Sequence, residues 1–257
     1  MICAEDEIGI GTDHNGIIVL PGTAVPGTPA AEYYNLKSDY LIEVDITPNR
    51  ADACSHYGVA RDCMPWLVQN GHKTLASSVV RQFQGGQPRV GHRHRSAKRG
   101  GLSPLCCRDA PELRGEGKSE WLQDKLRIIG LRPINNIVDV TNYIMFAYGQ
   151  PLHCFDADMI KGGKVVVKTM PDGTPFVTLD GEEHKLSDRD LAICNMEEPM
   201  CIAGVFGGKG SGTYETTRDV LLESAYFNPT WIRKSARRHG LSTDASFRFE
   251  RGIDRTV

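Results

Sequence analysis

The sequence predicts an α+β fold, and three observations support this class. Short apolar runs, such as Lys164–Thr169 and Leu191–Cys194, are typical of strands. Segments with helical spacing, such as Trp121–Ile129, do not alternate regularly with these runs, as they would in a doubly wound fold. The strand-like runs outnumber the helical segments, as is typical of an α+β domain. Neither G-x-x-x-x-G-K-[ST] nor a strand-linked G-x-G-x-x-G occurs, so the sequence shows no standard signature of nucleotide activation. We therefore expect a mixed sheet or sandwich with flanking helices.

The composition is that of an ordinary globular protein. The chain has 257 residues, of which 40% are hydrophobic and 24% charged, which allows one or two domains. Its formal charge of -2 means that nucleic acid would have to be bound by local patches. No apolar run approaches the length of a membrane helix, and the acidic start is unlike a signal peptide, so we expect a cytoplasmic protein without membrane contact. Eight cysteines without regular spacing indicate reduced thiols.

The first quarter of the chain predicts a strand followed by a helix. Residues Tyr40–Ile46 alternate in polarity, as a half-buried strand does. Asn49 can then cap a helix that runs from about Arg50 to Leu67. Arg50 and Arg61 on this helix could contact phosphate, or could simply be solvated.

Residues 76–118 are anomalous. Their basic composition, rich in Gly and Ser and without apolar periodicity, predicts a disordered linker. A basic RNA-binding arm is the functional alternative, and the stretch also reads like sequence translated out of frame. A zinc site is disfavoured because no C-x-x-C accompanies its conceivable ligands, which are His92, His94, Cys106 and Cys107.

The remaining elements follow from periodicity and turn residues. Helices are expected at Trp121–Ile129, ended by Gly130, and at Ile134–Tyr148, with Asn135 or Asn136 near its start. Further elements are a strand at Thr174–Leu179 with a turn at Asp180-Gly181, strands at Pro199–Val205 and Val220–Glu223, and a helix at Pro229–Arg238 ended by Gly240.

The segment Arg132–Asp156 concentrates polar residues among apolar ones. A buried polar group without a partner costs roughly 1 to 3 kcal/mol, so these side chains should bind each other, the backbone or a ligand. They are Arg132, Asn135, Asn136, Asp139, Thr141, Asn142, Gln150 and His153.

This segment and four later blocks resemble one known domain. The blocks are LDGEEHKL (179–186), AGVFGGKGSG (203–212), LLESAYFNP (221–229) and ARRHGLSTDASFRFERGID (236–254). Together they resemble the B3/B4 editing domain of bacterial phenylalanyl-tRNA synthetase beta subunits. EVDITPNRADACSHYGVARD (43–62) is similar to the B1 module, a small α/β module that contacts tRNA in that subunit. The resemblance implies a partial B1-like module at 1–78, without its inserted barrel, and a B3/B4-like domain at 79–257, of which 79–118 is anomalous.

The resemblance also implies a function. In this family the domain hydrolyses mischarged tyrosyl-tRNA(Phe) after transfer, while aminoacylation belongs to the alpha subunit. Editing would need no cofactor, whereas the full enzyme, a heterotetramer of two alpha and two beta subunits, would use ATP and Mg. A non-catalytic module that binds tRNA or serves as a subunit scaffold is the alternative. A hydrolase built from His153, Asp156 and Cys154 is disfavoured, because sequence neighbours cannot easily turn toward one another.

The resemblance assigns roles to individual residues. His153 and Thr243 would be catalytic, by orienting the attacking water, although Glu223 and a ribose hydroxyl of the tRNA also remain candidates for the general base. Glu223 would read the phenol hydroxyl of tyrosine, whereas from the sequence alone it could equally be exposed or paired with an arginine. The substrate-binding set would comprise Glu223, Arg132, Thr141, Asn142, Gln150, Pro151, Gly207 and Ala245, with no metal ligand.

Overall fold

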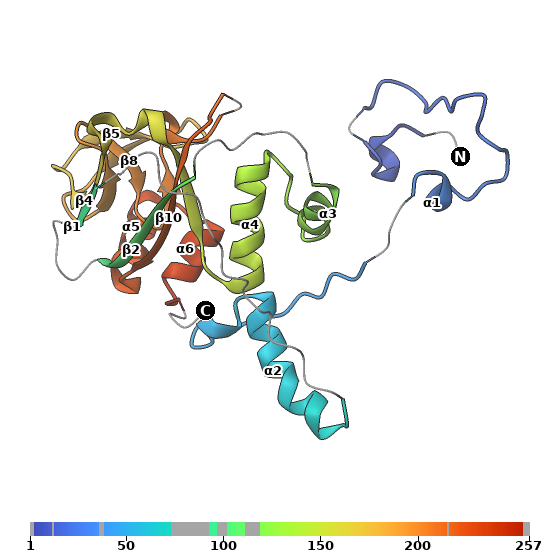
Figure 1. Ribbon diagram of the computed structural model, residues 1–257, viewed down its shortest axis with the longest axis horizontal. Coiled ribbons are helices and arrows are strands. Elements are labelled where there is room, and N and C mark those ends of the chain that lie inside the picture. The colour runs from blue at the N-terminus through green and yellow to red at the C-terminus, as the bar shows by residue number, and fades with distance from the viewer. Residues whose placement is uncertain are drawn as a thin grey trace. The chain divides into compact units, whose positions relative to one another are not determined.

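The structure, a computed structural model, describes residues 3–11, 13–35, 39–72, 93–96, 102–110, 119–214 and 216–253. The chain divides into two compact units, residues 1–42 and 43–257 (Figure 1). The first unit contains the short helices η1 (Asp6–Ile8) and α1 (Ala30–Tyr33), joined by turns. All the described strands and all the predicted site residues belong to the second unit, on which the following paragraphs concentrate.

The strand predicted at Tyr40–Ile46 is wrong. Residues 39–47 have neither helical nor strand structure, and the Tyr40 side chain is 91% exposed. A strand forms only where a neighbouring strand completes its backbone hydrogen bonds. Among the described residues, no strand pairs with this segment, so alternating polarity alone does not produce one here.

The next helix begins later than predicted. Residues 51–53 form the one-turn helix η2 (Ala51–Ala53), and α2 (His56–Gln69) follows. Its N-cap is Ser55, whose Oγ accepts a hydrogen bond from the Gly58 amide at 3.0 Å, and not Asn49. A Cβ atom on Gly58 would lie 1.9 Å from the Asp52 carbonyl oxygen, so the tight packing of η2 on α2 requires glycine there.

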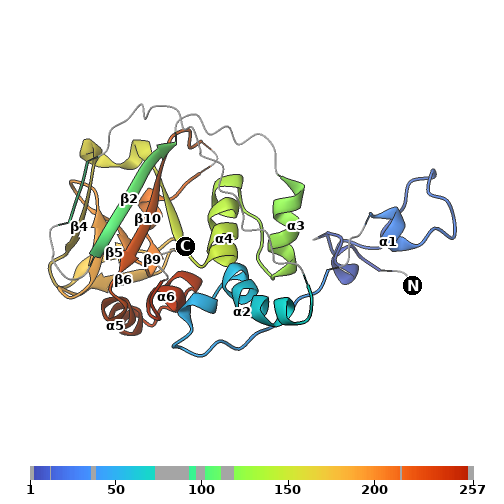
Figure 2. The same ribbon diagram turned by 60° about the horizontal axis from the view of Figure 1, so that its bottom comes forward.

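The two helices predicted on either side of Arg132 are confirmed. They are α3 (Glu120–Ile128) and α4 (Asn136–Tyr148), which pack against each other. The Asn135 side chain caps α4 by accepting from the Val138 amide, and Gly149 ends it with a φ of 83°. Figure 2 shows α4 between α3 and the sheets, and α4 contacts β3 directly.

The sheets confirm the predicted α+β class. The larger sheet has the order β1-β4-β7-β8-β9, in which β1 and β4 are parallel and the other neighbours antiparallel. The second sheet has the order β2-β10-β3 and is antiparallel throughout, and β5 and β6 form a hairpin. The strands are β1 (Arg93–Ser96), β2 (Leu102–Ala110), β3 (Leu152–Asp156), β4 (Lys164–Thr169), β5 (Thr174–Val177), β6 (Glu183–Leu186), β7 (Leu191–Cys194), β8 (Pro199–Ile202), β9 (Phe206–Gly207) and β10 (Val220–Phe227).

The disorder predicted for residues 76–118 is wrong where β1 and β2 lie. Strand β2 pairs with β10 along the whole length of β10 (Figure 1), so hydrogen bonds to a distant segment supply the order that the composition does not encode. The remaining residues of the interval lie outside the described residues. The RNA-binding arm and the zinc site remain untested, because they depend on residues or side chains that are not described.

One apolar core lies between the two sheets. It joins residues of the larger sheet, such as Ile193 and Ile202, to Phe155 and Phe227 of the smaller one, and all four are at most 1% exposed. Two C-terminal helices cover this core, α5 (Pro229–His239) through Ile232 and α6 (Asp244–Phe249) through Phe249. Three one-turn helices complete the fold: η3 (Ala157–Met159), η4 (Lys161–Gly163) and η5 (Lys209–Ser211).

Candidate functional site

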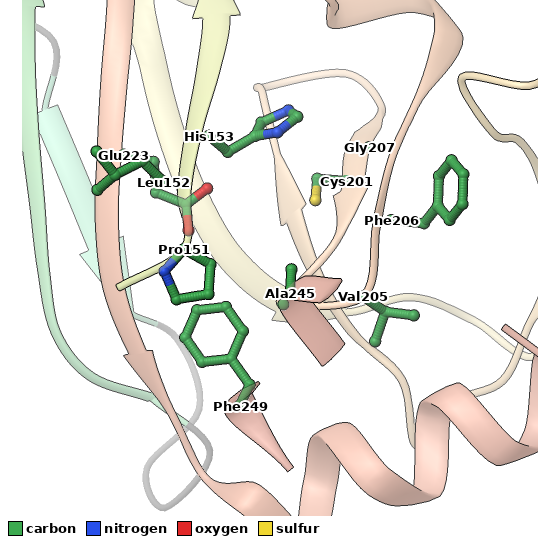
Figure 3. Close-up of a pocket in the computed structure, with 11 residues that line it drawn as sticks. Pro151, Leu152, His153, Cys201, Val205, Phe206, Gly207, Glu223, Ala245 and Phe249 are labelled. Carbon is green, nitrogen blue, oxygen red and sulfur yellow. The ribbon is translucent and has the colours of Figure 1, made fainter. Parts of the chain in front are cut away.

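A small cavity lies where the two sheets and α6 meet (Figure 3). Its volume is about 70 Å³. Strand β3 and the residue before it supply one wall, β10 and α6 supply others, and β8, β9 and the loop between them close it. The lining residues are Pro151, Leu152, His153, Cys201, Gly204, Val205, Phe206, Gly207, Glu223, Ala245 and Phe249.

Glu223 occupies a core position in β10. Along this strand Leu221, Glu223, Ala225 and Phe227 are buried, while the three residues between them are half-buried. The alternation of a strand therefore turns an acidic side chain toward the core. Its Oε2 is buried and has no hydrogen-bond partner. Because burial penalises the charged form, the pKa of Glu223 rises to about 8, and the side chain is predominantly a neutral acid at pH 7.

His153 lies directly across from Glu223 on the neighbouring strand β3. Directly opposed residues of antiparallel strands project from the same face, so both side chains enter the cavity. The edge of the imidazole meets the Phe155 ring, with the centroids 4.6 Å apart, and Nε2 is buried without a partner. Burial lowers the pKa of His153 to about 4, so the ring is neutral at pH 7.

Gln150 positions the start of β3. Its Nε2 donates to the carbonyl oxygens of Pro151 and Ala225, at 2.9 and 3.0 Å. These bonds join the turn after Gly149 to β10, on which Glu223 lies. Gln150 therefore does not line the cavity in this structure, whereas Pro151 does.

Thr243 is bound within the protein. Its Oγ1 accepts from the Ser246 amide, capping α6, and donates to the carbonyl oxygen of Val205 at 2.9 Å. The hydroxyl thus joins α6, which carries Ala245, to the loop between β8 and β9. These bonds use its one donor and one of its two acceptor lone pairs, and its direct role in placing water stays a prediction.

Besides Gln150 and Thr243, three further predicted residues do not line the cavity. Thr141 is buried in α4 and donates to the Val138 carbonyl oxygen, Asn142 is half-buried in the same helix, and Arg132 is exposed before it. None of them lines the cavity, to which the residues after Gly149 contribute but those before it do not. The assigned roles of the three stay predictions.

Two carboxylates of the chain itself bind Arg50, for which a phosphate contact was considered. The guanidinium donates to Asp52 at 2.9 Å and to Asp62 at 2.6 Å, so two carboxylates already neutralise it. Arg61 lies 3.8 Å from the Asp52 carboxylate. The structure therefore favours the interpretation that these arginines are structural.

The disfavoured thiol hydrolase also lacks the required geometry. His153 and Cys154 are successive residues of β3 and project from opposite faces. Burial, with Glu223 nearby, raises the pKa of Cys154 to about 12, which opposes thiolate formation. Asp156 accepts from Thr217 at 2.6 Å instead of from the imidazole.

Some lining residues were not predicted. Cys201, Phe206 and Phe249 reach the cavity, but the sequence does not distinguish them from core residues. Strand register identifies Cys201, which lies opposite Gly207 in the β8-β9 pair, and the packing of α6 brings Phe249 to the cavity. Within the described part of the chain, no cluster of three or more potential metal ligands occurs, and no helix has the length and apolarity needed to cross a membrane.

Comparison with known proteins places this cavity in a defined domain class. The family described as B3/4 domain matches residues 108–257, which include every residue that lines the cavity. The chain belongs to the B3/4 domain family. The match begins inside the predicted domain 79–257, and the boundary at residue 78 stays a prediction.

The whole chain is similar to phenylalanine–tRNA ligase beta subunits, which confirms the predicted resemblance. It is 64% identical to the subunit of Bacteroides fragilis over 263 residues, covering 100% of this chain and 32% of the relative. It is 53% identical to that of Porphyromonas gingivalis, covering 99% and 31%. The chain thus spans about a third of the length of these relatives. A crystal structure of an N-terminal fragment of the phenylalanyl-tRNA synthetase beta subunit from Pyrococcus horikoshii matches with a TM-score of 0.42 and 13% identity, over 76% of this chain and 60% of that one.

Proposed function

We propose that the cavity is the editing site of a phenylalanine–tRNA ligase, in which the tyrosyl ester of mischarged tRNA(Phe) is hydrolysed. Phenylalanine and tyrosine differ by one hydroxyl, which an apolar synthetic site rejects only weakly. A second site that requires the hydroxyl corrects this error. The single observation that carries the proposal is the buried, unpartnered Oε2 of Glu223 in a cavity that is otherwise mainly apolar.

The protonation of Glu223 suits it to this task. As a neutral acid it can donate to the phenol oxygen or accept from the phenol O–H. A phenylalanine ring offers neither bond and leaves the buried acid unsatisfied, which disfavours it by about 10⁴ to 10⁵ where a site is built around such a bond. Burial of the acid therefore supplies selectivity.

The size of the cavity sets a condition on binding. An apolar cavity of about 150 Å³ admits benzene, whereas this one, at about 70 Å³, is smaller. The slot of aromatic size expected for the substrate is therefore only partly open. We expect lining side chains to move when a tyrosyl group enters, with Phe206 and Leu152 the half-buried candidates.

The proposed chemistry is attack of water on the ester carbonyl, driven mainly by positioning. His153, neutral and with a free Nε2, would hold the water. Glu223 is a poor general base once it is engaged by the phenol, and a ribose hydroxyl of the tRNA remains an alternative. Thr243 would act by holding Ala245 and α6 in place.

The proposal includes the setting of the complete enzyme. The partners would be tRNA(Phe) and an alpha subunit, in a cytoplasmic heterotetramer of two alpha and two beta subunits. ATP and Mg would serve aminoacylation in the alpha subunit, and editing in this chain would use no cofactor. The similarity to phenylalanine–tRNA ligase beta subunits supports the ligase assignment.

Deacylation by the complete ligase tests the proposal. Tyrosyl-tRNA(Phe) and phenylalanyl-tRNA(Phe) are offered separately, and the rate of ester loss is measured. We expect selective loss of the tyrosyl ester, and Glu223→Ala should reduce its rate by at least about a hundredfold. Glu197→Ala, which truncates an exposed glutamate, is the matched control. Equal loss of both esters would contradict the selectivity.

A binding module without catalysis is the second candidate. It is favoured if neither ester is hydrolysed while tRNA binding persists. The small volume of the cavity, about 70 Å³, is the observation that favours this candidate. Measuring tRNA affinity with wild type and Glu223→Ala in parallel separates the two, because a scaffold has no need of the buried acid.

A further inference from the structure

Cys201 occupies a defined place in the floor of the cavity. It lies in β8, next to the edge strand β9 of the larger sheet, and pairs with Ile193 of β7 on one side and with Gly207 of β9 on the other. The residue is 5% exposed and lines the cavity. Because Cys201 and Gly207 are directly opposed, they project from the same face of the sheet.

This pair faces the pair formed by Glu223 and His153 on the other sheet. A Cβ atom on Gly207 would lie 2.8 Å from the imidazole Cε1 of His153, so Gly207 lies directly against His153. Cys201, the neighbour of Gly207 across the strand pair, lines the same cavity as Glu223, and the two side chains are close enough for Glu223 to raise the pKa of the thiol. Figure 3 shows the Cys201 sulfur and the Glu223 carboxyl on opposite sides of the same space.

The thiol is a weak competitor for the carboxyl. Its Sγ lies 3.4 Å from the Ile202 carbonyl oxygen, to which it donates, and the Glu223 Oε2 has no partner. Burial, together with the nearby Glu223, raises the pKa of Cys201, which keeps it an uncharged thiol. A serine of nearly the same shape would present a strong O–H donor at this point.

We propose that Cys201 is a specificity-determining residue, because it opposes Glu223 with a compact side chain that leaves the carboxyl unsatisfied until a ligand hydroxyl arrives. This inference rests on the proposed function and extends it to the wall that faces the acid. A hydroxyl at position 201 would bind the carboxyl, directly or through a retained water. The ligand hydroxyl would then replace an existing hydrogen bond of the Glu223 carboxyl instead of making the first hydrogen bond to it.

Two substitutions in the complete ligase test the inference. Cys201→Ser should lower the ratio of tyrosyl to phenylalanyl deacylation rates by about tenfold, since about one hydrogen bond of selectivity is lost. Cys201→Ala, which adds no donor, should keep the preference for the tyrosyl ester. Cys194→Ser is the matched control, because this buried cysteine of β7 does not line the cavity. The inference is overturned if Cys201→Ser leaves the ratio unchanged, or if Cys194→Ser lowers it equally.

A second measurement separates this inference from the proposed function. Binding of p-cresol and toluene to this chain is measured by ligand-observed NMR, which requires neither tRNA nor hydrolysis. We expect wild type and Cys201→Ala to prefer p-cresol, and Cys201→Ser to lose about tenfold of that preference. If wild type hydrolyses both esters equally, the proposed function fails, and this measurement still decides the role of Cys201. Equal binding of p-cresol and toluene by wild type, or an unchanged preference in Cys201→Ser, overturns the inference.

Discussion

Gly207 lies against the imidazole of His153, with space for a hydrogen but not for a methyl group. A Cβ atom at position 207 would lie 2.8 Å from Cε1 and 3.2 Å from Nε2 of the ring, and 2.8 Å from Cδ1 of Leu179. The ring has little room to retreat, because Phe155 meets it edge-on. The position of the imidazole thus depends on the absence of a side chain on the facing sheet.

Gly207→Ala should therefore lower the rate of tyrosyl deacylation strongly and the free energy of unfolding only moderately. Overpacking of this kind typically costs about 1 to 3 kcal/mol, and the imidazole would leave its position to relieve the contact. The rate of tyrosyl ester loss and the free energy of unfolding are the two measurements. Gly210→Ala is the control, because a Cβ atom there meets nothing within 4 Å. Unchanged deacylation by Gly207→Ala would exclude a positioned imidazole.

Glu223→Gln should make stability less sensitive to pH. The pKa of Glu223 is about 8 in the folded state against 4.5 as the ordinary value, so between these pH values the folded state binds more protons. This contribution is fully present below pH 4.5 and is lost as the pH rises to 8. Urea unfolding should show wild type losing up to about 1.4 kcal/mol per pH unit in that window relative to Glu223→Gln. Glu197→Gln serves as the control, and parallel curves for wild type and Glu223→Gln would show that the acid is not buried.

The opposite sign is expected for His153. Its pKa of about 4 lies below the ordinary value of 6.5, so the stability that the neutral ring contributes is fully present above pH 6.5 and is lost as the pH falls to about 4. The NMR signal of the ring C–H groups should not titrate between pH 5 and 8. In His153→Asn the acid unfolding midpoint should move to lower pH. A titration midpoint near 6.5 would mean that water reaches the ring freely.

Thr243 should act by positioning, and conservative substitution should reveal it. Thr243→Ala removes the cap of α6 and the bond to Val205, and should cost about 1 to 2 kcal/mol of stability and lower deacylation. Thr243→Ser keeps both bonds and should restore both properties. The free energy of unfolding and the kcat of ester loss are measured for each variant. If Thr243→Ser were stable but inactive, the threonine methyl group, and not the hydroxyl bonds, would be the essential feature.

Much of the secondary structure follows from local chemistry in the sequence. Asn135 and Gly149 mark the two ends of α4, and the turn at Asp180-Gly181 marks the β5-β6 hairpin. These signals act over a few residues, through hydrogen bonds and backbone preferences that do not depend on the rest of the chain. The acid at position 223 is also visible in the sequence, because it interrupts an apolar run.

Long-range strand pairing explains the features of the structure that local sequence patterns did not predict. Tyr40–Ile46 has the alternation of a strand and no described partner, while β2 has an unpromising composition and pairs with β10. Cys201 resembles any other core residue in the sequence, and its relation to Glu223 arises because two registers place both against one cavity. Residue chemistry and helix ends can be read along the chain, whereas the meeting of an acid, an imidazole and a thiol depends on which strands pair and in what register. The free energy of the whole core determines which strands pair and in what register.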